Sequence, residues 1–252
     1  TGLAELVVGL YLLYFVLRRS PVLRLQKGEH LRFNRPQLCT MLCIAAPVAS
    51  EKVILTTAQI VSTAIVAPLG TVAIAANSFA ITAESLCYMP AYGIQSAAAM
   101  LVGQSVGAGR RQMARRLGWV TVLIGVAVMI ITGGLLYILA PQMMAILTPN
   151  PDIIALGARV LRIEAFAEPL FGASIVAGGV FQGVGSTLIP TLFNLGTMWG
   201  IRIPLAWLAA PRWGLPGVWT AMCLELCVRG VLYLTRLVGK RWLPPGDQNE
   251  QA

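Results

Sequence analysis

The sequence predicts an all-α protein: a polytopic bundle of about seven membrane-spanning helices, the first of them truncated. Of its 252 residues, 57% are hydrophobic and 12% are charged, a composition that the surface of a soluble domain does not tolerate. In lipid, every backbone N–H and C=O must be bonded within a helix or a closed barrel. The apolar residues come in long runs and not in alternating ten-residue segments, which favours helices.

Seven apolar stretches are candidates for these spans. They cover residues 2–17, 38–65, 73–106, 117–140, 153–182, 188–210 and 215–238. Glycine- and proline-rich breakers separate them, as at residues 68–70 and 149–151. Pro90 and Pro169 predict kinks in the long third and fifth stretches. The first run, Leu3 to Leu17, extends only about 22 Å, so we expect the natural protein to continue upstream.

The net charge of +9 is distributed as short basic clusters beside the apolar stretches. Residues 18–36 carry six lysines and arginines, 107–116 carry four, and the segment after residue 235 carries three. The loops at the opposite ends hold only Arg212. By the positive-inside rule, the basic connections and the C-terminus lie in the cytoplasm. We therefore expect a multi-pass protein of the cell inner membrane with a disordered polar tail at 243–252.

Several classes of function do not fit this sequence. The basic clusters do not form the single basic face that binds nucleic acid. Residues 178–187 are rich in glycine but lack the lysine of a phosphate-binding P-loop. His30, the only histidine, has no cluster of cysteines or carboxylates nearby for a metal site or a catalytic triad. We therefore expect no enzyme, no cofactor, no metal and no nucleic-acid partner.

Eight ionisable residues are predicted to lie about 15 to 22 Å into their helices, which is deep in the membrane. They are Glu51, Lys52, Glu84, Glu164, Glu168, Arg202, Glu225 and Arg229. Facing lipid, they would cost on the order of 20 kcal/mol, so we expect them to face inward. Because five are acids and three are bases, about two carboxylates should take up protons or hold a cation. Structural ion pairing is the alternative.

Helical spacing separates these acids further. Glu225 and Arg229 are four residues apart, which suits a structural ion pair on one helix face. Glu164 and Glu168 have the same spacing but like charge, so protonating one is easier than ionising both.

Polar side chains in neighbouring stretches either line a wet cavity with these acids or bond helices to one another. Tyr88 follows Glu84 by one helical turn, and further amides lie in the second and sixth stretches. The candidate cation- or substrate-binding residues are Glu51, Glu84, Glu168, Glu164, Gln59, Tyr88, Asn194 and Arg202.

Five segments carry a resemblance to a known family. They are PVASEKVILTTAQIVSTAIVAPLGTVAIAANSFAI from Pro47, ESLCYMPAYGIQSAAAMLVGQSVGAGRRQMARR from Glu84, GGVFQGVGSTLIPT from Gly178, and IRIPLAW from Ile201 with GLPGVWTAM from Gly214. In order and spacing, these segments resemble the seventh, eighth, tenth, eleventh and twelfth helices of the multidrug and toxic compound extrusion (MATE) family.

The resemblance implies a two-lobed transporter of twelve helices, of which this chain would supply the C-terminal lobe. Residues 1–18 would then be the last helix of the N-terminal lobe, 19–37 a basic cytoplasmic loop between the lobes, and 38–242 the six-helix C-terminal lobe. Family members with a cation site in this lobe place acids where this sequence has Leu55 and Phe171. Glu51 and Glu168 come about one turn earlier. Other members couple through an aspartate of the N-terminal lobe, which this chain lacks.

The sequence therefore predicts a secondary active transporter that exports cationic drugs or organic compounds by antiport with protons or sodium. Binding of the coupling ion at Glu51, Glu84 or Glu168 would displace the substrate by alternating access. The expected partners are small cationic substrates, membrane lipids and the missing N-terminal lobe. Two alternatives stay open: a flippase for lipid-linked saccharides, with Arg202 binding phosphate, and a non-transporting scaffold subunit of the membrane.

Overall fold

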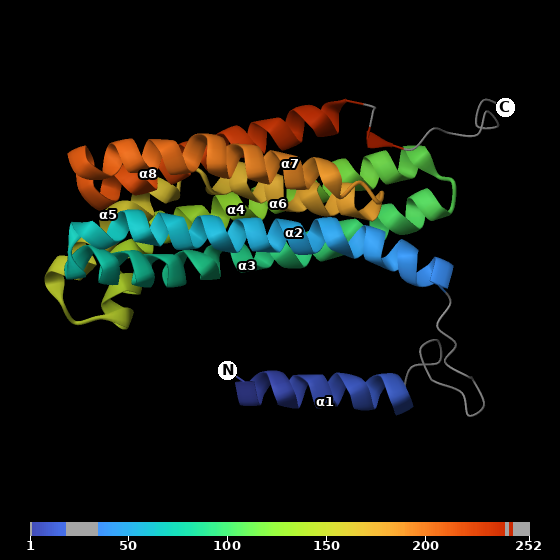
Figure 1. The fold of residues 1–252 in the computed structure, drawn as a ribbon, viewed down its shortest axis with the longest axis horizontal. Helices are drawn as coiled ribbons and strands as arrows, with labels where there is room; N and C mark the ends of the chain where they lie inside the picture. Colours follow the sequence, from blue (N-terminus) through green and yellow to red (C-terminus); the bar gives the residue numbers. More distant parts are fainter. Residues whose placement is uncertain (1, 19–34, 240–241, 244–252) are drawn as a thin grey trace. The chain divides into compact units, whose positions relative to one another are not determined.

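A computed structural model describes residues 2–18, 35–239 and 242–243 of the chain (Figure 1). It divides into two compact units, residues 1–42 and residues 43–252. In the first unit, helix α1 (Gly2–Arg18) has an apolar surface that is almost entirely exposed. Most of the predicted basic loop at 19–37 and of the predicted tail at 243–252 lies outside the described residues, and the domain boundaries stay a prediction.

The described residues form helices and no strands, which confirms the all-α prediction. After α1, the elements are α2 (Arg35–Val66), the 3₁₀ turn η1 (Ala67–Leu69), α3 (Thr71–Gly107), α4 (Arg111–Leu147), α5 (Pro151–Glu164), α6 (Glu168–Gly183), α7 (Leu188–Thr197), the π-helical segment η2 (Met198–Arg202) and α8 (Ile203–Val238). Among the described residues, the segment Lys52–Leu69, α3 and α4 are long and apolar enough to cross a membrane.

The turns between helices fall at the predicted breakers. Gly70 and Gly109 have φ angles of 97° and 75°, in the left-handed region that glycine adopts at little cost. Before α5, the side chain of Asn150 accepts a hydrogen bond of 3.0 Å from the backbone N–H of Asp152 and caps the helix. Local chemistry therefore sets the helix ends on both sides of α4.

The predicted stretch 153–182 is not one helix. It is interrupted by a turn at residues 165–167, where the N–H of Ala167 bonds the carbonyl of Glu164 at 2.8 Å. Pro169 lies in the first turn of α6, where its missing N–H leaves no helical bond unmade. The expected kink at this proline is therefore a helix break just before it, whereas Pro90 does lie inside continuous α3.

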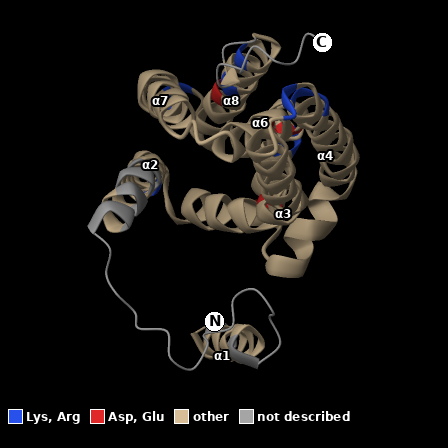
Figure 2. Cartoon of the chain, turned by 90° about the vertical axis from the view of Figure 1, so that its right-hand side faces the viewer, with Lys and Arg blue, Asp and Glu red and all other residues tan. Residues whose placement is uncertain are grey.

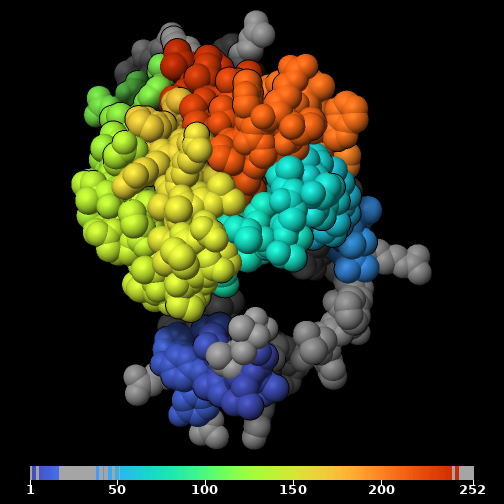
Figure 3. All heavy atoms as spheres, turned by 90° about the vertical axis from the view of Figure 1, so that its left-hand side faces the viewer, coloured from blue at the N-terminus to red at the C-terminus, as the bar shows by residue number. Residues whose placement is uncertain are grey.

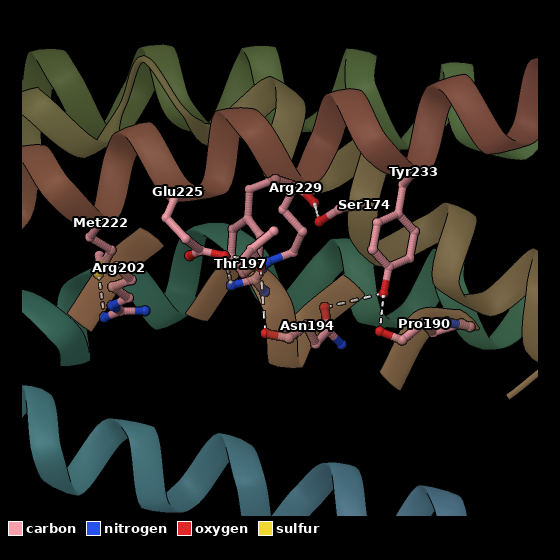
Figure 4. A network of polar contacts seen from close by, with 10 residues as sticks. Ser174, Pro190, Asn194, Thr197, Arg202, Met222, Glu225, Arg229 and Tyr233 are labelled. Atoms are coloured by element: carbon pink, nitrogen blue, oxygen red, sulfur yellow. Dashed lines mark hydrogen bonds and ion pairs between the residues drawn. The ribbon is translucent and has the colours of Figure 1, made fainter. Parts of the chain in front are cut away.

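The last two predicted spans form an antiparallel hairpin, although α8 is continuous by hydrogen bonding. Gly214 has a non-helical conformation (φ 61°, ψ −148°) that reverses the chain inside α8. The two arms contact each other at increasing distance from this turn. Gly217 packs on Ala209, Arg202 contacts Met222, and Asn194 contacts Tyr233 (Figure 4). This confirms the predicted turn at 211–217.

The second unit buries two apolar clusters at different levels along its axis. One lies toward the end that carries Arg110, Arg116 and Arg236, which Figure 2 faces, and we call it the basic-end cluster. It includes Val102, Val122, Val176, Phe181, Tyr233, Leu237 and Trp242. The other, the opposite-end cluster, includes Val66, Ala80, Leu136, Met144, Leu161, Trp219 and Leu226.

Polar and small contacts attach the outer helices to these clusters. Among the described side chains of α2, those of Ala58, Ser62 and Val66 are buried, and their spacing of four places them on one helix face. The indole N–H of Trp219 in α8 donates a 2.9 Å hydrogen bond to Oδ1 of Asn77 in α3. This buried bond joins two segments 142 residues apart in the chain.

Helices α3 and α6 touch backbone to backbone through glycines. A Cβ added at Gly183 would lie 2.5 Å from the carbonyl oxygen of Ala99, and one at Gly179 would collide with Gln95. Small residues allow helices in membranes to approach in this way. Gly179 and Gly183 are one turn apart and therefore lie on the same face of α6. Only residues without a side chain fit where this face contacts α3.

We predict that Gly179→Ala lowers the stability of the chain by about 1 to 3 kcal/mol, because the new methyl group has no space against Gln95. Gly134→Ala in α4 is the matched control, since a Cβ there meets nothing within 4 Å. It should leave stability unchanged or raise it by up to about 1 kcal/mol through helix propensity. Thermal unfolding of the purified chain in detergent measures both, and equal shifts would contradict the close contact.

Candidate functional site

Ionisable side chains from several helices gather at the inner edge of the opposite-end cluster. We call this group the polar layer, and it consists of Glu84 (α3), Glu164 (α5), Glu168 (α6), Arg202 (η2), Glu225 (α8) and Arg229 (α8). On α3, Glu84 lies among residues of the opposite-end cluster. Seven positions later comes Ala91, which belongs to a third, small cluster with Met129 and Ile175. On α8, Glu225 and Arg229 fall between Met222 of the opposite-end cluster and Tyr233 of the basic-end cluster.

The acids of the polar layer face the interior of the bundle, as predicted from the cost of exposing them to lipid. The exposed fractions of Glu164, Glu168 and Glu225 are 0%, 1% and 0%. Glu84 is 6% exposed and Arg229 8% exposed, whereas Arg202 is half-buried. A buried charge persists only when it is paired, hydrogen-bonded or neutralised, so each of these side chains needs a partner.

Glu225 and Arg229 supply that partner to each other. Nε and Nη2 of Arg229 donate to Oε1 of Glu225 at 2.8 and 2.6 Å, which confirms the predicted i, i+4 ion pair (Figure 4). The other oxygen, Oε2 of Glu225, is buried without a hydrogen-bond partner among the described residues. The pair is thus compensated in charge but incompletely bonded.

Glu164 and Glu168 have no such compensation. All four of their carboxylate oxygens are buried and lack a hydrogen-bond partner among the described residues. Glu168 lies in the first turn of α6, where the helix dipole favours negative charge. Gly133 of α4 packs over it, since an added Cβ would lie 3.0 Å from Cβ of Glu168. The break between α5 and α6 therefore places two unpaired acids in a tightly packed interior.

The remaining acid, Glu84, connects these two to the arginine of η2. Glu84 interacts electrostatically with Glu168 and with Arg202. The thiol of Cys87 lies beside Glu168 and also beside the hydroxyl of Thr132, and both of these uncharged residues were missed from the sequence. Cys87 follows Glu84 by three residues and therefore shares its helix face, and this spacing could have identified the thiol from the sequence. Nothing in the local sequence of α4 pointed to Thr132.

Arg202 is the cation of the polar layer that forms no ion pair within the described residues. Its Nη2 lies 2.7 Å from the sulfur of Met222, a weak acceptor (Figure 4). The residue ends the π-helical segment η2, an irregularity that often occurs at functional sites. Its guanidinium interacts electrostatically with Glu84, Glu164 and Glu225 from across the layer.

The other predicted site residues are dispersed. Tyr88 is half-buried near the acids, with its ring 5.7 Å from that of Phe171. Asn194 lies nearer the basic end, where its Oδ1 accepts a 3.1 Å bond from the hydroxyl of Tyr233. Gln59 is exposed on α2, and so is Lys52, for which the expectation of an inward-facing side chain is wrong. Glu51 belongs to α2, but its side chain lies outside the described part of the structure.

Charge in the polar layer does not balance. It holds four carboxylates and two guanidinium groups among the described residues, and one guanidinium is committed to Glu225. In the described ranges, no three His, Cys, Asp or Glu side chains converge closely enough to hold a metal ion. The arrangement can neutralise its excess charge by binding protons or a cation at Glu84, Glu164 and Glu168.

Comparison with protein families identifies most of the second unit. Residues 47–208 match the model of the MatE family. A probable multidrug resistance protein NorM of Chromobacterium violaceum is 31% identical over 186 residues, which are 70% of this chain and 40% of that protein. One from Thermotoga maritima is 27% identical over 93% of this chain and 51% of its own length. The chain spans about half the length of the curated relatives it matches.

Solved structures give the same fold at lower sequence identity. A crystal structure of a MATE protein in complex with MaL6 superposes with a TM-score of 0.83 at 15% identity, covering 94% of this chain and 55% of that one. The bent form of the Vibrio cholerae transporter VcmN superposes with a TM-score of 0.80 at 14% identity, covering 95% and 53%. At this identity the likeness establishes the helical fold alone.

We predict that Arg229→Met destabilises the chain by about 3 to 5 kcal/mol, because it leaves the carboxylate of Glu225 buried without a counter-charge. The double variant Glu225→Gln with Arg229→Met should recover most of this loss, since neither charge is then left alone. Thermal unfolding of the four proteins in a double-mutant cycle measures the coupling. Additive effects of the two substitutions would show that the pair does not stabilise the fold.

Proposed function

Because the chain belongs to the MatE family, we propose that it forms the C-terminal half of a secondary active transporter that exports cationic organic compounds. The names of the NorM relatives support drugs as the substrates. Apolar helices and family membership make the chain part of a multi-pass membrane protein. We place it in the cell inner membrane with its basic end in the cytoplasm, following the positive-inside rule.

The excess of carboxylates in the polar layer carries this proposal. A substrate cation or a coupling ion that neutralises Glu84, Glu164 or Glu168 removes the cost of an unpaired buried charge. The same carboxylate cannot hold a proton or sodium ion and an organic cation at once. Binding of the one therefore displaces the other, which is the exchange that an antiporter requires.

Transport also needs the site to open alternately to the two sides of the membrane. The partner that makes this possible in our proposal is an N-terminal lobe of similar size, consistent with the half-length match to the relatives. Rocking of one helical bundle against another exposes a site between them in many secondary transporters. The break between α5 and α6 and the π-helical segment η2 are the irregular backbone segments at the level of the acids.

The composition of the layer favours a cation exporter over the two alternatives. A flippase for lipid-linked saccharides has to bind phosphate, and Arg202 is the one arginine of the layer without a carboxylate paired to it in the described residues. A scaffold subunit needs no unpaired buried charge, and Glu164 and Glu168 would then cost stability without serving a purpose.

The test is efflux of a fluorescent organic cation from cells that carry the transporter with this chain in place. We predict that Glu84→Gln, Glu164→Gln and Glu168→Gln each lower efflux. A loss of about 1.4 kcal/mol in the free energy of cation binding corresponds to about a tenfold decrease. Glutamine keeps the shape but cannot hold the exchanged cation. Proton and sodium gradients, imposed separately, identify the coupling ion.

Asp152→Asn is the matched control for these variants, since Asp152 is an exposed acid in the first turn of α5. It should transport at the normal rate. All variants are compared at equal abundance in the membrane. Normal efflux by the three glutamine variants would disprove the proposed site, and competition by lipid phosphates instead of organic cations would favour the flippase.

A further inference from the structure

A groove on the outside of the bundle lies between α4, α5 and α8, and Arg162 and Cys223 of its lining are each two residues from an acid of the polar layer. Its volume is about 760 Å³, and it lies toward the end opposite the basic residues, which Figure 3 faces. Its walls are mostly apolar, with Tyr137, Pro141 and Ile154 among them. Two arginines, Arg159 and Arg162, also line it. We call this feature the α4–α5 groove.

Arg162 is held in place within the α4–α5 groove. Its Nε lies 3.4 Å from the carbonyl oxygen of Tyr137, and its guanidinium carbon lies 5.6 Å from the centre of the Tyr137 ring. The Tyr137 ring in turn packs edge-on against that of Phe166, with 5.7 Å between centroids. These contacts fix the guanidinium while leaving its two Nη groups without a partner among the described residues.

Arg159 adds a second positive charge to the same groove. It is exposed and has no hydrogen bond or ion pair within the described residues. Asp152, the one exposed acid of α5, lies seven residues earlier, about 10 Å along the helix axis. The groove therefore combines an apolar wall with two guanidinium groups that no carboxylate neutralises.

The level of these arginines matches the surface region of a bilayer. Helix α4 has 37 residues and is about 55 Å long, whereas the hydrocarbon core is about 30 Å thick. About 12 Å of the helix thus extends beyond the core at each end. Arg159 lies about 12 Å along α5 from its first residue, Pro151, next to the end of α4. Its charge is therefore near the boundary between headgroups and acyl chains.

We propose that the α4–α5 groove binds an anionic phospholipid. The phosphate of the headgroup accepts hydrogen bonds from Arg159 and Arg162, and an acyl chain lies on the apolar wall that includes Ile154 and Phe166. Planar guanidinium groups are suited to phosphate oxygens. The two positive charges also disfavour the cationic substrates of the proposed transporter, so this site is distinct from the polar layer and independent of the proposed function.

Cys223 makes the occupancy of the groove measurable, because this thiol lines it and is partly exposed. The experiment uses the purified full chain with its other four cysteines changed to alanine, in nanodiscs of phosphatidylglycerol or of phosphatidylcholine. N-ethylmaleimide, an uncharged reagent, labels the thiol. We expect slower labelling of Cys223 in phosphatidylglycerol, because a bound lipid covers the groove.

The Arg159→Gln/Arg162→Gln variant should label at similar rates in the two lipids, since each arginine contributes about fivefold to binding an anionic lipid. Arg212→Gln is the matched control, because Arg212 is exposed at the same end but does not line the groove. It should keep the difference between the lipids. The Arg159→Lys/Arg162→Lys variant should retain part of it, which separates lost charge from a lost fold.

Four results would overturn the proposal. Equal labelling of the unmodified groove in the two lipids would show no preference for negative charge. A preference that survives in Arg159→Gln/Arg162→Gln would place the lipid elsewhere or reflect the surface charge of the nanodisc. Protection of Cys223 from labelling by soluble glycerol phosphate would assign the groove to a free anion. Equal protection of Cys223 in both lipids once a second protein half is added would assign the groove to that half.

Discussion

An unpaired carboxylate in a protein interior is the constraint on which this structure depends, because it must find a counter-charge, a proton or a bound cation. The polar layer contains one satisfied pair, Glu225 with Arg229, and three acids that this pair does not serve. Arg202 interacts electrostatically with two of these acids, Glu84 and Glu164, without forming an ion pair to either among the described residues. The layer therefore combines one compensated ion pair with acids that lack a counter-charge, and our proposal of ion-coupled transport rests on this combination.

The backbone around the layer is arranged to hold these groups at the inner edge of the opposite-end cluster. The break before Pro169 turns Glu164 and Glu168 inward on separate helices, and the π-helical segment ends at Arg202. On either side, close packing is maintained by small residues, as where Gly179 meets Gln95. Irregular backbone at membrane depth persists only where protein or a cavity surrounds it. Here the surrounding protein is α3, α4 and α8.

Much of this arrangement could be predicted from residue spacing. The cost of charge in lipid predicted that Glu84, Glu164 and Glu168 turn inward, and the spacing of four predicted the pair of Glu225 with Arg229. The break at 165–167 was not predicted, because proline is compatible both with a kink and with the first turn of a new helix. Asn194 was also expected at the site, but its amide bonds the hydroxyl of Tyr233 nearer the basic end, and Gln59 is exposed on α2.

The sequence by itself determined that this chain is a bundle of apolar helices, where most of them end, and which side chains are too costly to face lipid. These properties follow from composition and from neighbours within one or two turns. Only the tertiary structure decided which acids share one layer, that Cys87 lies beside Glu168, and that Arg159 and Arg162 line an apolar groove. Such contacts join residues far apart in the chain, and they depend on how helices rotate and pack against one another, which helical periodicity does not specify.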